Sequence, residues 1–171
     1  CNGKKFQNIN FTLHKGEIVG LAGFVGAGRT EVLTSIFGAD KLDSGEIYIK
    51  GEKVSIHSPK EAIAHRISMI PENRRDDGLI TSMSIKENAQ LSVIDRISNK
   101  GFLSKKKSKD LMEQMIEKYS IKIGNMDDKI LTLSGGNQQK VVIAKWIGND
   151  PEILLCDEPT RGIDVGAKAE V

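Results

Sequence analysis

The sequence predicts an α/β fold in which strands near both ends of the chain flank a helical middle. Short apolar runs typical of buried strands in a parallel sheet occur at residues 17–22, 67–70 and 153–156. Residues 104–119 instead carry apolar side chains at the three-to-four spacing of a helix that packs on one face. Strands separated by helical segments are the pattern of α/β proteins, and the helical middle reads as an inserted subdomain.

The first predicted elements are two strands and a helix. Residues 6–13 largely alternate apolar and polar side chains, which predicts an edge strand. Residues 17–22 predict a buried strand, and a glycine-rich loop leads from it into a helix. Gly38 follows the last apolar residue of that helical pattern and can end the helix.

A small β-element is expected next, over residues 44–56, where short apolar runs are separated by glycine. Ser58 and Pro59 then begin a short helix, because serine caps helix ends and proline suits the first helical position. Residues 67–70 predict another strand, and the polar residues 72–78 predict a loop.

Three helices and a strand complete the pattern. Ser84 caps a helix that runs to Leu91, and a second helix spans about residues 104–119. Ser134 caps a third helix, and residues 153–156 form a strand that ends in two acidic residues.

Length and composition are those of one domain with a hydrophobic core. The chain has 171 residues, and its formal net charge of +2 is too small to indicate nucleic acid or a membrane surface as a partner. No apolar stretch approaches the roughly 18–20 residues that cross a bilayer. Cys1 and Cys156 form no paired pattern, so we expect a buried thiol at Cys156 and a reducing, cytosolic setting. The chain begins without methionine and ends within an expected helix, so we expect it to be part of a longer protein.

The glycine-rich loop fits the phosphate-loop pattern G-x-x-x-x-G-[basic]-[Ser/Thr], directly after a predicted strand and before a helix. Glycines are needed there because successive backbone N–H groups must curl around a phosphate. The Thr30 hydroxyl is placed to bind Mg²⁺. The predicted nucleotide-binding residues are Gly23, Phe24, Val25, Gly26, Ala27, Gly28, Arg29, Thr30 and Glu31.

The basic position of this loop holds Arg29 where the pattern usually has lysine. Arginine keeps the positive charge, so we expect nucleotide binding to survive. Its broad planar fork should displace the terminal phosphate from the in-line geometry that phosphoryl transfer requires. Glu31 adds a carboxylate in the first helical turn, close to the expected phosphate and Mg²⁺. The loop is therefore expected to bind better than it catalyses.

Asp157 and Glu158 follow the last predicted strand, at the edge of an α/β sheet where ligands usually bind. Together with the phosphate loop, these acids predict a catalytic site. Asp157 is expected to hold Mg²⁺, and Glu158 to act as the general base or to orient the attacking water.

Residues 133–140, Leu-Ser-Gly-Gly-Asn-Gln-Gln-Lys, resemble the signature motif of ATP-binding cassette (ABC) ATPases, in the form found in importers of monosaccharides. Residues 157–168 resemble the Walker B and D-loop motifs of the same group. Residues 23–31 resemble the Walker A motif of the second, C-terminal cassette in duplicated ATPases of ribose- and galactose-type importers, which typically has arginine in place of lysine. The resemblance covers essentially the whole chain, in order.

The resemblance implies a P-loop ABC ATPase domain with a RecA-like core sheet, an N-terminal antiparallel β-element and an inserted α-helical subdomain. Residues 1–171 would form one partial domain, with the ATPase core at 1–75 and 150–171 and the helical subdomain at about 76–149. Glu72 stands at the Q-loop position, where most members have glutamine. The signature residues would be Leu133, Ser134, Gly135, Gly136, Asn137 and Gln138, and the D-loop residues Gly162, Ile163 and Asp164.

In ABC ATPases two cassettes sandwich two ATP molecules, each bound with Mg²⁺ between the Walker A motif of one cassette and the signature motif of the other. The resemblance therefore implies a partner cassette, either the N-terminal sister in the same subunit or a second cassette. It further implies transmembrane permease subunits, an indirect link to a periplasmic or extracellular sugar-binding protein, and a position on the cytoplasmic face of the cell membrane. Nucleic acid is not an expected partner.

Other functions fit parts of the pattern. A non-transport ABC ATPase would also carry a signature motif, but we expect such a protein to contain a coiled-coil or basic insertion. A catalytically weak regulatory module fits Arg29 and Glu72, whereas Glu158 argues against it. A phosphate-loop GTPase is excluded because the base-reading Asn-Lys-x-Asp motif is missing from the sequence. A nucleoside is the alternative cargo, and the intact acidic pair at Asp157 favours a sugar.

Overall fold

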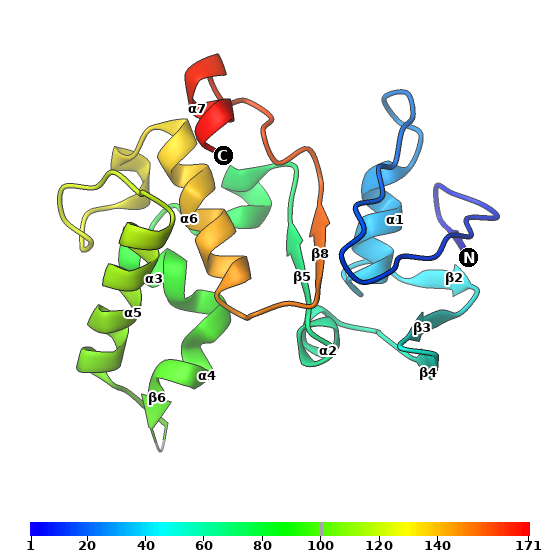
Figure 1. Ribbon diagram of the computed structural model, residues 1–171, viewed down its shortest axis with the longest axis horizontal. Coiled ribbons are helices and arrows are strands. Elements are labelled where there is room, and N and C mark those ends of the chain that lie inside the picture. The colour runs from blue at the N-terminus through cyan, green and yellow to red at the C-terminus, as the bar shows by residue number, and fades with distance from the viewer. Residues whose placement is uncertain (100) are drawn as a thin grey trace.

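A pair of parallel strands stands at the centre of the molecule (Figure 1). β5 (Ile67–Ile70) and β8 (Ile153–Cys156) lie far apart in the sequence but pair along their whole length. The computed structural model describes residues 1–99 and 101–171. Because parallel strands point the same way, the residues that follow β5 and those that follow β8 meet at one edge of the pair.

Most of the N-terminal part lies on one side of this pair (Figure 1). Its elements are β1 (Asn2–Gly3), α1 (Arg29–Ile36), β2 (Leu42–Ser44), β3 (Ile47–Ile49), β4 (Glu52–Val54) and α2 (Pro59–Ala64). The β1–β2 and β3–β4 pairs are antiparallel, and the β3–β4 pair confirms the small β-element expected over residues 44–56. α2 also begins as predicted, since the Ser58 hydroxyl accepts a hydrogen bond from the Glu61 amide at 3.3 Å.

The helical middle of the chain lies on the other side of the strand pair (Figure 1). Its elements are the π-helical turn η1 (Arg74–Gly78), α3 (Ile85–Gln90), the 3₁₀ turn η2 (Leu91–Val93), α4 (Ile94–Ile97), β6 (Ser98–Asn99), β7 (Phe102–Leu103), α5 (Lys105–Lys118), the 3₁₀ turn η3 (Ile130–Thr132) and α6 (Gly135–Ile147). α7 (Val165–Glu170) follows β8. The predicted cap of α3 is confirmed, because Ser84 and Glu87 form a reciprocal capping box. Within the described ranges, none of the helices has the length and apolar character to span a membrane.

Helix α6 belongs to both hydrophobic cores. One core lies among α3, α5 and α6 and contains the fully buried side chains of Ile85, Met112 and Val141. The other core surrounds β5 and β8 and contains Phe37, which follows α1. Trp146 of α6 packs against both, and its ring meets that of Phe37 edge-on, with centroids 5.5 Å apart. The position of α6 relative to the strand pair is therefore fixed by packing on two sides.

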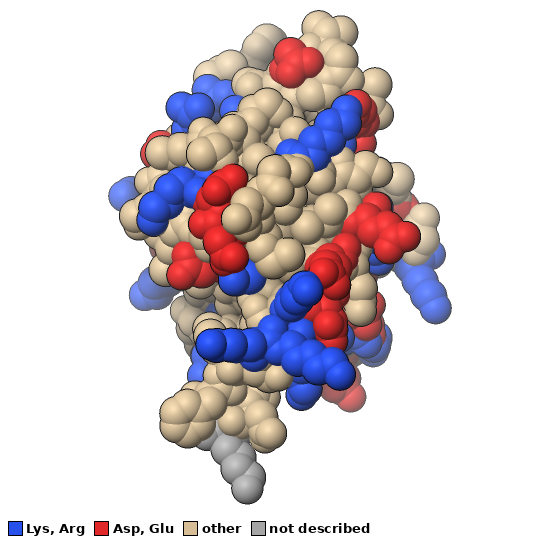
Figure 2. Space-filling view, turned by 90° about the vertical axis from the view of Figure 1, so that its left-hand side faces the viewer, with Lys and Arg blue, Asp and Glu red and all other residues tan. Residues whose placement is uncertain are grey.

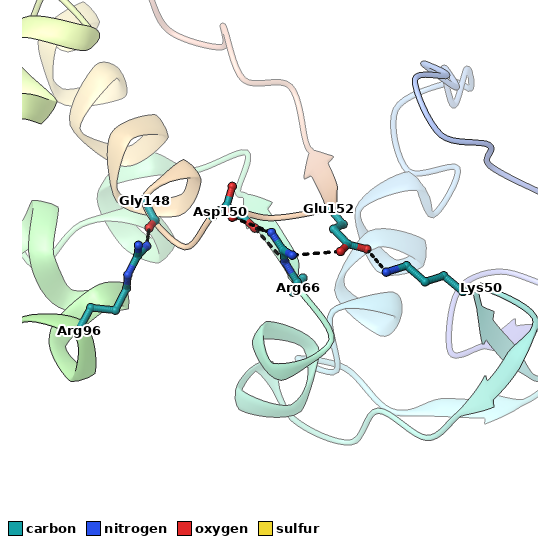
Figure 3. A network of polar contacts seen from close by, with 6 residues as sticks. All are labelled: Lys50, Arg66, Arg96, Gly148, Asp150 and Glu152. Atoms are coloured by element: carbon teal, nitrogen blue, oxygen red, sulfur yellow. Dashed lines mark hydrogen bonds and ion pairs between the residues drawn. The ribbon is translucent and has the colours of Figure 1, made fainter.

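A network of charged side chains lies at the amino ends of β5 and β8 (Figure 3). The Arg66 guanidinium donates to the Asp150 carbonyl oxygen and carboxylate, each at 2.7 Å, and to the Glu152 carboxylate at 3.1 Å. Lys50, between β3 and β4, pairs with the other oxygen of Glu152 at 2.7 Å. Lys50, Arg66 and Asp150 all have positive φ angles, so these contacts hold turns whose backbone is otherwise disfavoured.

Two of the predicted strands are wrong, because residues 6–13 and 17–22 form none. Ile18 is 97% exposed, and the Glu17 amide bonds locally to the His14 carbonyl at 3.0 Å. A strand needs a neighbour for its backbone groups, and among residues 1–99 and 101–171 β8 pairs with β5 alone. Apolar runs and alternation predict which side chains would be buried, but they do not reveal whether a partner strand is available.

Two smaller predictions also need correction. The polar stretch 72–78 is not simply a loop, because most of it forms η1, whose first turn is capped by the side chain of Asn73. Cys156 is exposed rather than buried. Successive residues of a strand point to opposite faces, and β8 buries the face of Leu155 while Cys156 points away from it.

Candidate functional site

The glycine-rich loop leads directly into α1, as its sequence predicts. Gly28 caps the helix in left-handed backbone with a φ of 85°, and its carbonyl accepts a hydrogen bond from the Val32 amide at 3.0 Å. A Cβ on Gly28 would lie 2.7 Å from the Lys5 carbonyl oxygen, so both backbone and space require glycine. Phe24 and Val25 are almost fully exposed. The first amides of α1, together with the helix dipole, make this a favourable place for a phosphate group.

Arg29 joins this loop to the end of β8. Its Nη2 atom donates a hydrogen bond to Glu158 Oε1 at 3.1 Å, and both side chains remain partly exposed. The structure therefore brings together two predicted site residues that come from opposite ends of the chain. A carboxylate oxygen that accepts from a guanidinium has one lone pair fewer for a water molecule. The candidate general base, Glu158, is thus engaged by the arginine of the predicted phosphate loop.

Asp157 has the surroundings of a metal ligand. Its amide donates to the Ile70 carbonyl at 2.9 Å, which completes the β5–β8 pair, and its side chain is buried at 5% exposure. The carboxylate oxygen Oδ2 is shut off from solvent and has no hydrogen-bond partner. A buried, unpaired carboxylate oxygen is costly unless a cation or a donor approaches it, so Asp157 fits a bound Mg²⁺.

Thr30 is the other predicted Mg²⁺ ligand, in the first turn of α1. Thr30 follows Arg29 and Asp157 precedes Glu158, so the Arg29–Glu158 contact joins the two segments that carry the predicted ligands. The described residues contain no cluster of three or more histidine, cysteine or acidic side chains that could hold a metal. Magnesium held by one carboxylate and one hydroxyl takes its other ligands from phosphate oxygens and water, as at nucleotide sites.

The Glu31 carboxylate, expected beside the phosphate, is paired with a lysine side chain. It accepts a hydrogen bond from Lys5 Nζ at 2.6 Å. Lys5 holds the pKa of Glu31 below its ordinary value, and Glu31 raises the pKa of Lys5. The negative charge that Glu31 adds beside the loop is therefore largely balanced by a residue that sequence reasoning did not single out.

The predicted signature residues lie at the start of α6. The Ser134 hydroxyl caps the helix by accepting from the Asn137 amide at 3.4 Å and from the Asn137 side-chain amide at 3.2 Å. Gln138 is buried and donates to the Leu133 carbonyl at 3.0 Å, so its side chain supports the turn from inside. Gly136 is required for close packing, since a Cβ there would lie 2.7 Å from the Cβ of Ala167 in α7.

A pocket of about 320 Å³ opens beside this helix start, and residues of the D-loop and α7 share it. Its lining residues are Lys122, Ser134, Gly136, Asn137, Asp164, Gly166, Ala167 and Glu170. Asp164 accepts from the Ala167 amide at 2.9 Å and so caps α7, while Ile163 is buried and Gly162 has a φ of 65°. Ser134, Gly136 and Asn137 of the predicted signature motif thus line one pocket with Asp164 of the predicted D-loop.

The predicted Q-loop position is connected to the turn that leads into the predicted D-loop residues. The Glu72 carboxylate pairs with the Arg161 guanidinium, and two residues later Arg74 donates to the carbonyls of Arg161 and Gly162. Sequence reasoning assigned no role to Arg74. Its only sequence signal is a pair of basic residues in a polar stretch, which also describes an ordinary exposed loop.

The two groups of predicted site residues lie on opposite sides of the β5–β8 pair. α1, which carries Arg29, lies on one side, and the start of α6 and α7 lie on the other (Figure 1). The pocket at Ser134 is lined entirely by residues from 122 onward, so it includes none of the phosphate-loop residues. Within the chain, the signature motif and the phosphate loop do not form a single site.

The face of the molecule that carries the helical middle mixes charges of both signs. Lys and Arg side chains lie beside Asp and Glu side chains over this face (Figure 2). Lys109 pairs with Glu113 at 3.7 Å on α5, and Glu170 pairs with Lys122 at 3.7 Å and with Lys140 at 2.7 Å. Neighbouring opposite charges cancel at a distance, so this face does not present the extended positive field that favours nucleic acid.

The chain matches a known protein family over most of its length. The family model described as ABC transporter matches residues 6–161. The ribose import ATP-binding protein RbsA of Oceanobacillus iheyensis is 50% identical over 166 residues, which are 97% of this chain and 34% of that protein. RbsA of Bacillus subtilis is 47% identical over the same shares of the two chains. The chain thus spans about a third of the length of these relatives.

Solved structures of similar fold are also ATP-binding cassettes. The cassette MJ0796 in a dimeric post-hydrolysis state bound to ADP and Pi superposes with a TM-score of 0.78, at 28% identity, over 95% of this chain and 69% of that one. A second dimeric structure of MJ0796 gives a TM-score of 0.68 at 26% identity, over 85% of this chain and 62% of that one. The α/β fold with its phosphate loop is therefore the fold of these cassettes.

Proposed function

Because this chain belongs to the ABC transporter family, we propose that it is the second, C-terminal nucleotide-binding domain of a duplicated ATPase that drives the import of a sugar. The proposal of sugar import rests on the relatives named for ribose import. The proposal of a duplicated subunit rests on the length of those relatives, of which this chain spans about a third. Within the chain, residues 1–75 and 150–171 would form the ATPase core and residues 76–149 the helical subdomain. A ribose-type monosaccharide is the proposed cargo class.

The chain's own site binds ATP with Mg²⁺ in this proposal. The loop ahead of α1 holds the phosphates through its amides and through Arg29, while Thr30 and Asp157 hold the metal. Bound Mg²⁺ would neutralise charge that develops on the phosphates during transfer. The unpaired, buried oxygen of Asp157 supports this assignment.

Hydrolysis at this site is proposed to be slow. Arg29 is broader than lysine, and it donates to Glu158, the residue that would otherwise take a proton from water. While Arg29 contacts Glu158 the candidate base is engaged, and when Arg29 turns toward a phosphate its broad guanidinium should displace that phosphate from the in-line position. This site therefore holds nucleotide more effectively than it turns nucleotide over.

The signature residues are proposed to complete the site of a partner cassette. The observation that carries this proposal is that α1, which begins at Arg29, and the start of α6, which Ser134 caps, lie on opposite sides of the strand pair (Figure 1). Ser134 and the exposed amides at the start of α6 would donate to the terminal phosphate of a nucleotide held by the partner. The dimeric state of the related MJ0796 cassette is consistent with such a pairing.

The remaining partners follow from the same proposal. Permease subunits in the membrane would receive the closing and opening of the two cassettes, and a sugar-binding protein outside would deliver cargo to the permease. The chain would then lie on the cytoplasmic face of the membrane.

The test uses the full-length subunit assembled with its permease. We expect Ser134→Arg to reduce ATP turnover and transport by roughly 100-fold or more, the usual cost of losing a donor to the developing charge. Thr132→Arg is the matched control, since Thr132 is exposed, lies two positions away and does not line the pocket. Unchanged turnover in Ser134→Arg would reject the assignment to the partner site.

A further inference from the structure

The D-loop turn is held from two directions by residues of one short segment. We propose that Glu72 and Arg74 form a two-point clamp on the turn at Arg161 and Gly162, and that this clamp positions Ser134 and Asp164 toward the partner cassette's nucleotide. Glu72 and Arg74 act as positioning residues, because their contacts are to protein groups. The inference rests on the proposed role of the signature residues and adds to it the part that sets their position.

The first point of the clamp is a forked hydrogen bond. Arg74 Nη1 donates to the Arg161 carbonyl at 3.0 Å, and Nη2 donates to the Gly162 carbonyl at 3.2 Å. Two successive carbonyls can face one planar guanidinium because Gly162 has a φ of 65°, a backbone conformation that favours glycine. Lysine could not replace this contact, since its single ammonium lacks the two parallel donors of a guanidinium.

The second point of the clamp has the opposite polarity. The Glu72 carboxylate pairs with the side chain of Arg161, the residue whose carbonyl accepts from Arg74. The segment 72–74 therefore contributes one acidic and one basic side chain, and both contact the turn at Arg161 and Gly162. A surface ion pair alone contributes little stability. Together with the forked hydrogen bond from Arg74, the Glu72–Arg161 ion pair restricts movement of the turn relative to residues 72–74.

Arg74 also lies against the signature helix. A Cβ added at Gly135 would come within 2.8 Å of Arg74 Nη2, so a larger residue there would displace the guanidinium from its contacts with the turn. The Nε atom of Arg74 is shut off from solvent without a hydrogen-bond partner. The side chain is thus confined between the D-loop turn and the start of α6, and a shift of either would be transmitted to the other.

The segment that carries the clamp is itself anchored on α6. At the far end of η1, the Gly78 carbonyl accepts a hydrogen bond from Lys145 Nζ, which is buried. A Cβ on Gly78 would lie 3.2 Å from Val142, so η1 packs directly on the helix. η1 is therefore held at its end by α6 and at its beginning by the D-loop turn, and the three segments form one unit.

The functional consequence lies at the pocket beside Ser134. Asp164 follows the clamped turn by two residues and lines that pocket together with Ser134. Loss of the clamp would let the turn shift relative to α6 and misplace these side chains. Misplacement of a catalytic group by about 1 Å can cost on the order of 100-fold in rate, so the clamp should affect turnover more than ATP affinity.

The experiment compares variants of the full-length subunit, assembled with its permease in proteoliposomes. Arg74→Lys and Arg74→Gln are expected to lower kcat for ATP by roughly 10- to 100-fold, with the KM for ATP changing less than threefold. Arg75→Gln is the matched control, because Arg75 is the exposed neighbour and its side chain makes none of these contacts. A fall in kcat no larger than that of Arg75→Gln would overturn the clamp.

A charge exchange separates positioning from simple destabilisation. Glu72→Arg and Arg161→Glu should each lower kcat, and the double variant should recover at least part of the loss, because the pair is restored with its signs reversed. Additive losses in the double variant would argue against a specific contact between the two side chains.

Ser134→Arg keeps this test distinct from the test of the proposed function. If Ser134→Arg stops turnover while the Arg74 variants behave like Arg75→Gln, the partner-site role stands and the clamp is rejected. If Ser134→Arg leaves turnover intact, the proposed function itself fails, and the clamp fails with it.

Discussion

Lys145 offers a prediction whose size follows directly from its surroundings. Lys145 belongs to α6, and it is only 6% exposed. Its Nζ donates to the Gly78 carbonyl and lies 5.1 Å from the centre of the Trp146 ring. Burial lowers the pKa of Lys145 from 10.5 to about 8. The folded protein therefore loses this proton near pH 8, while the unfolded chain keeps it until about pH 10.5.

The sign of the effect follows from proton binding. Between pH 8 and pH 10.5 the unfolded state binds more protons at Lys145 than the folded state does, so the free energy of unfolding rises with pH over this window. The gap between the two pKa values corresponds to roughly 3 kcal/mol. Lys145→Met removes the titration while retaining most of the side-chain volume.

The assay is urea unfolding followed by the fluorescence of Trp146, the single tryptophan of this chain. The difference in unfolding free energy between the native chain and Lys145→Met should shift in favour of the native chain by roughly 3 kcal/mol between pH 7 and pH 10.5. Other lysines and tyrosines titrate in both proteins, so their contributions cancel in the difference. A difference that stays constant, or that shifts toward the variant as pH rises, would refute the reasoning.

Three further predictions concern the phosphate loop, the signature helix and the charged network. Arg29→Lys should raise ATP hydrolysis at this chain's own site, measured with the partner site inactivated, because Glu158 is then released from the guanidinium and the bulk beside the terminal phosphate is smaller; no gain would contradict the proposal that Arg29 slows this site. Gly136→Ala should lower the unfolding free energy by about 1–3 kcal/mol, because its Cβ would meet Ala167 at 2.7 Å, whereas Gly124→Ala, with its nearest neighbour at 3.8 Å, should not. Arg66→Ala should lower the unfolding free energy by about 1 kcal/mol through loss of its contacts to Asp150, and an effect no larger than that of exposed Arg75→Ala would count against the network.

Several helices of this fold could be predicted from sequence because their signals are local, whereas the turn η1 was not predicted. Ser58, Ser84 and Ser134 each lie next to the helix that they cap, and the hydroxyls accept the expected amide hydrogen bonds. The predicted strands at residues 6–13 and 17–22 failed because pairing depends on a partner far away in the chain. Alternation and apolarity carry no information about that partner.

The candidate site divides in the same way. The loop before α1 and the acids after β8 could be located because each motif is a short run with its own chemistry. The contacts that join one motif to another could not be located from the sequence. Arg29 reaches Glu158 across 129 positions, and Arg74 reaches Arg161 across 87. The resemblance to a family indicated which motifs act together, whereas only the structure shows which side chains hold them in place.

The central claim is that Ser134 serves a nucleotide held by another cassette, and labelling at that position tests it most directly. Ser134→Cys in the full-length subunit would be treated with an ATP analogue that carries a thiol-reactive group on its terminal phosphate, and the modified peptide identified by mass spectrometry. We predict that labelling persists when this chain's own phosphate loop is disabled by Gly28→Asp and disappears when the partner's phosphate loop is disabled. Labelling that instead depends on Gly28 and ignores the partner would contradict the account.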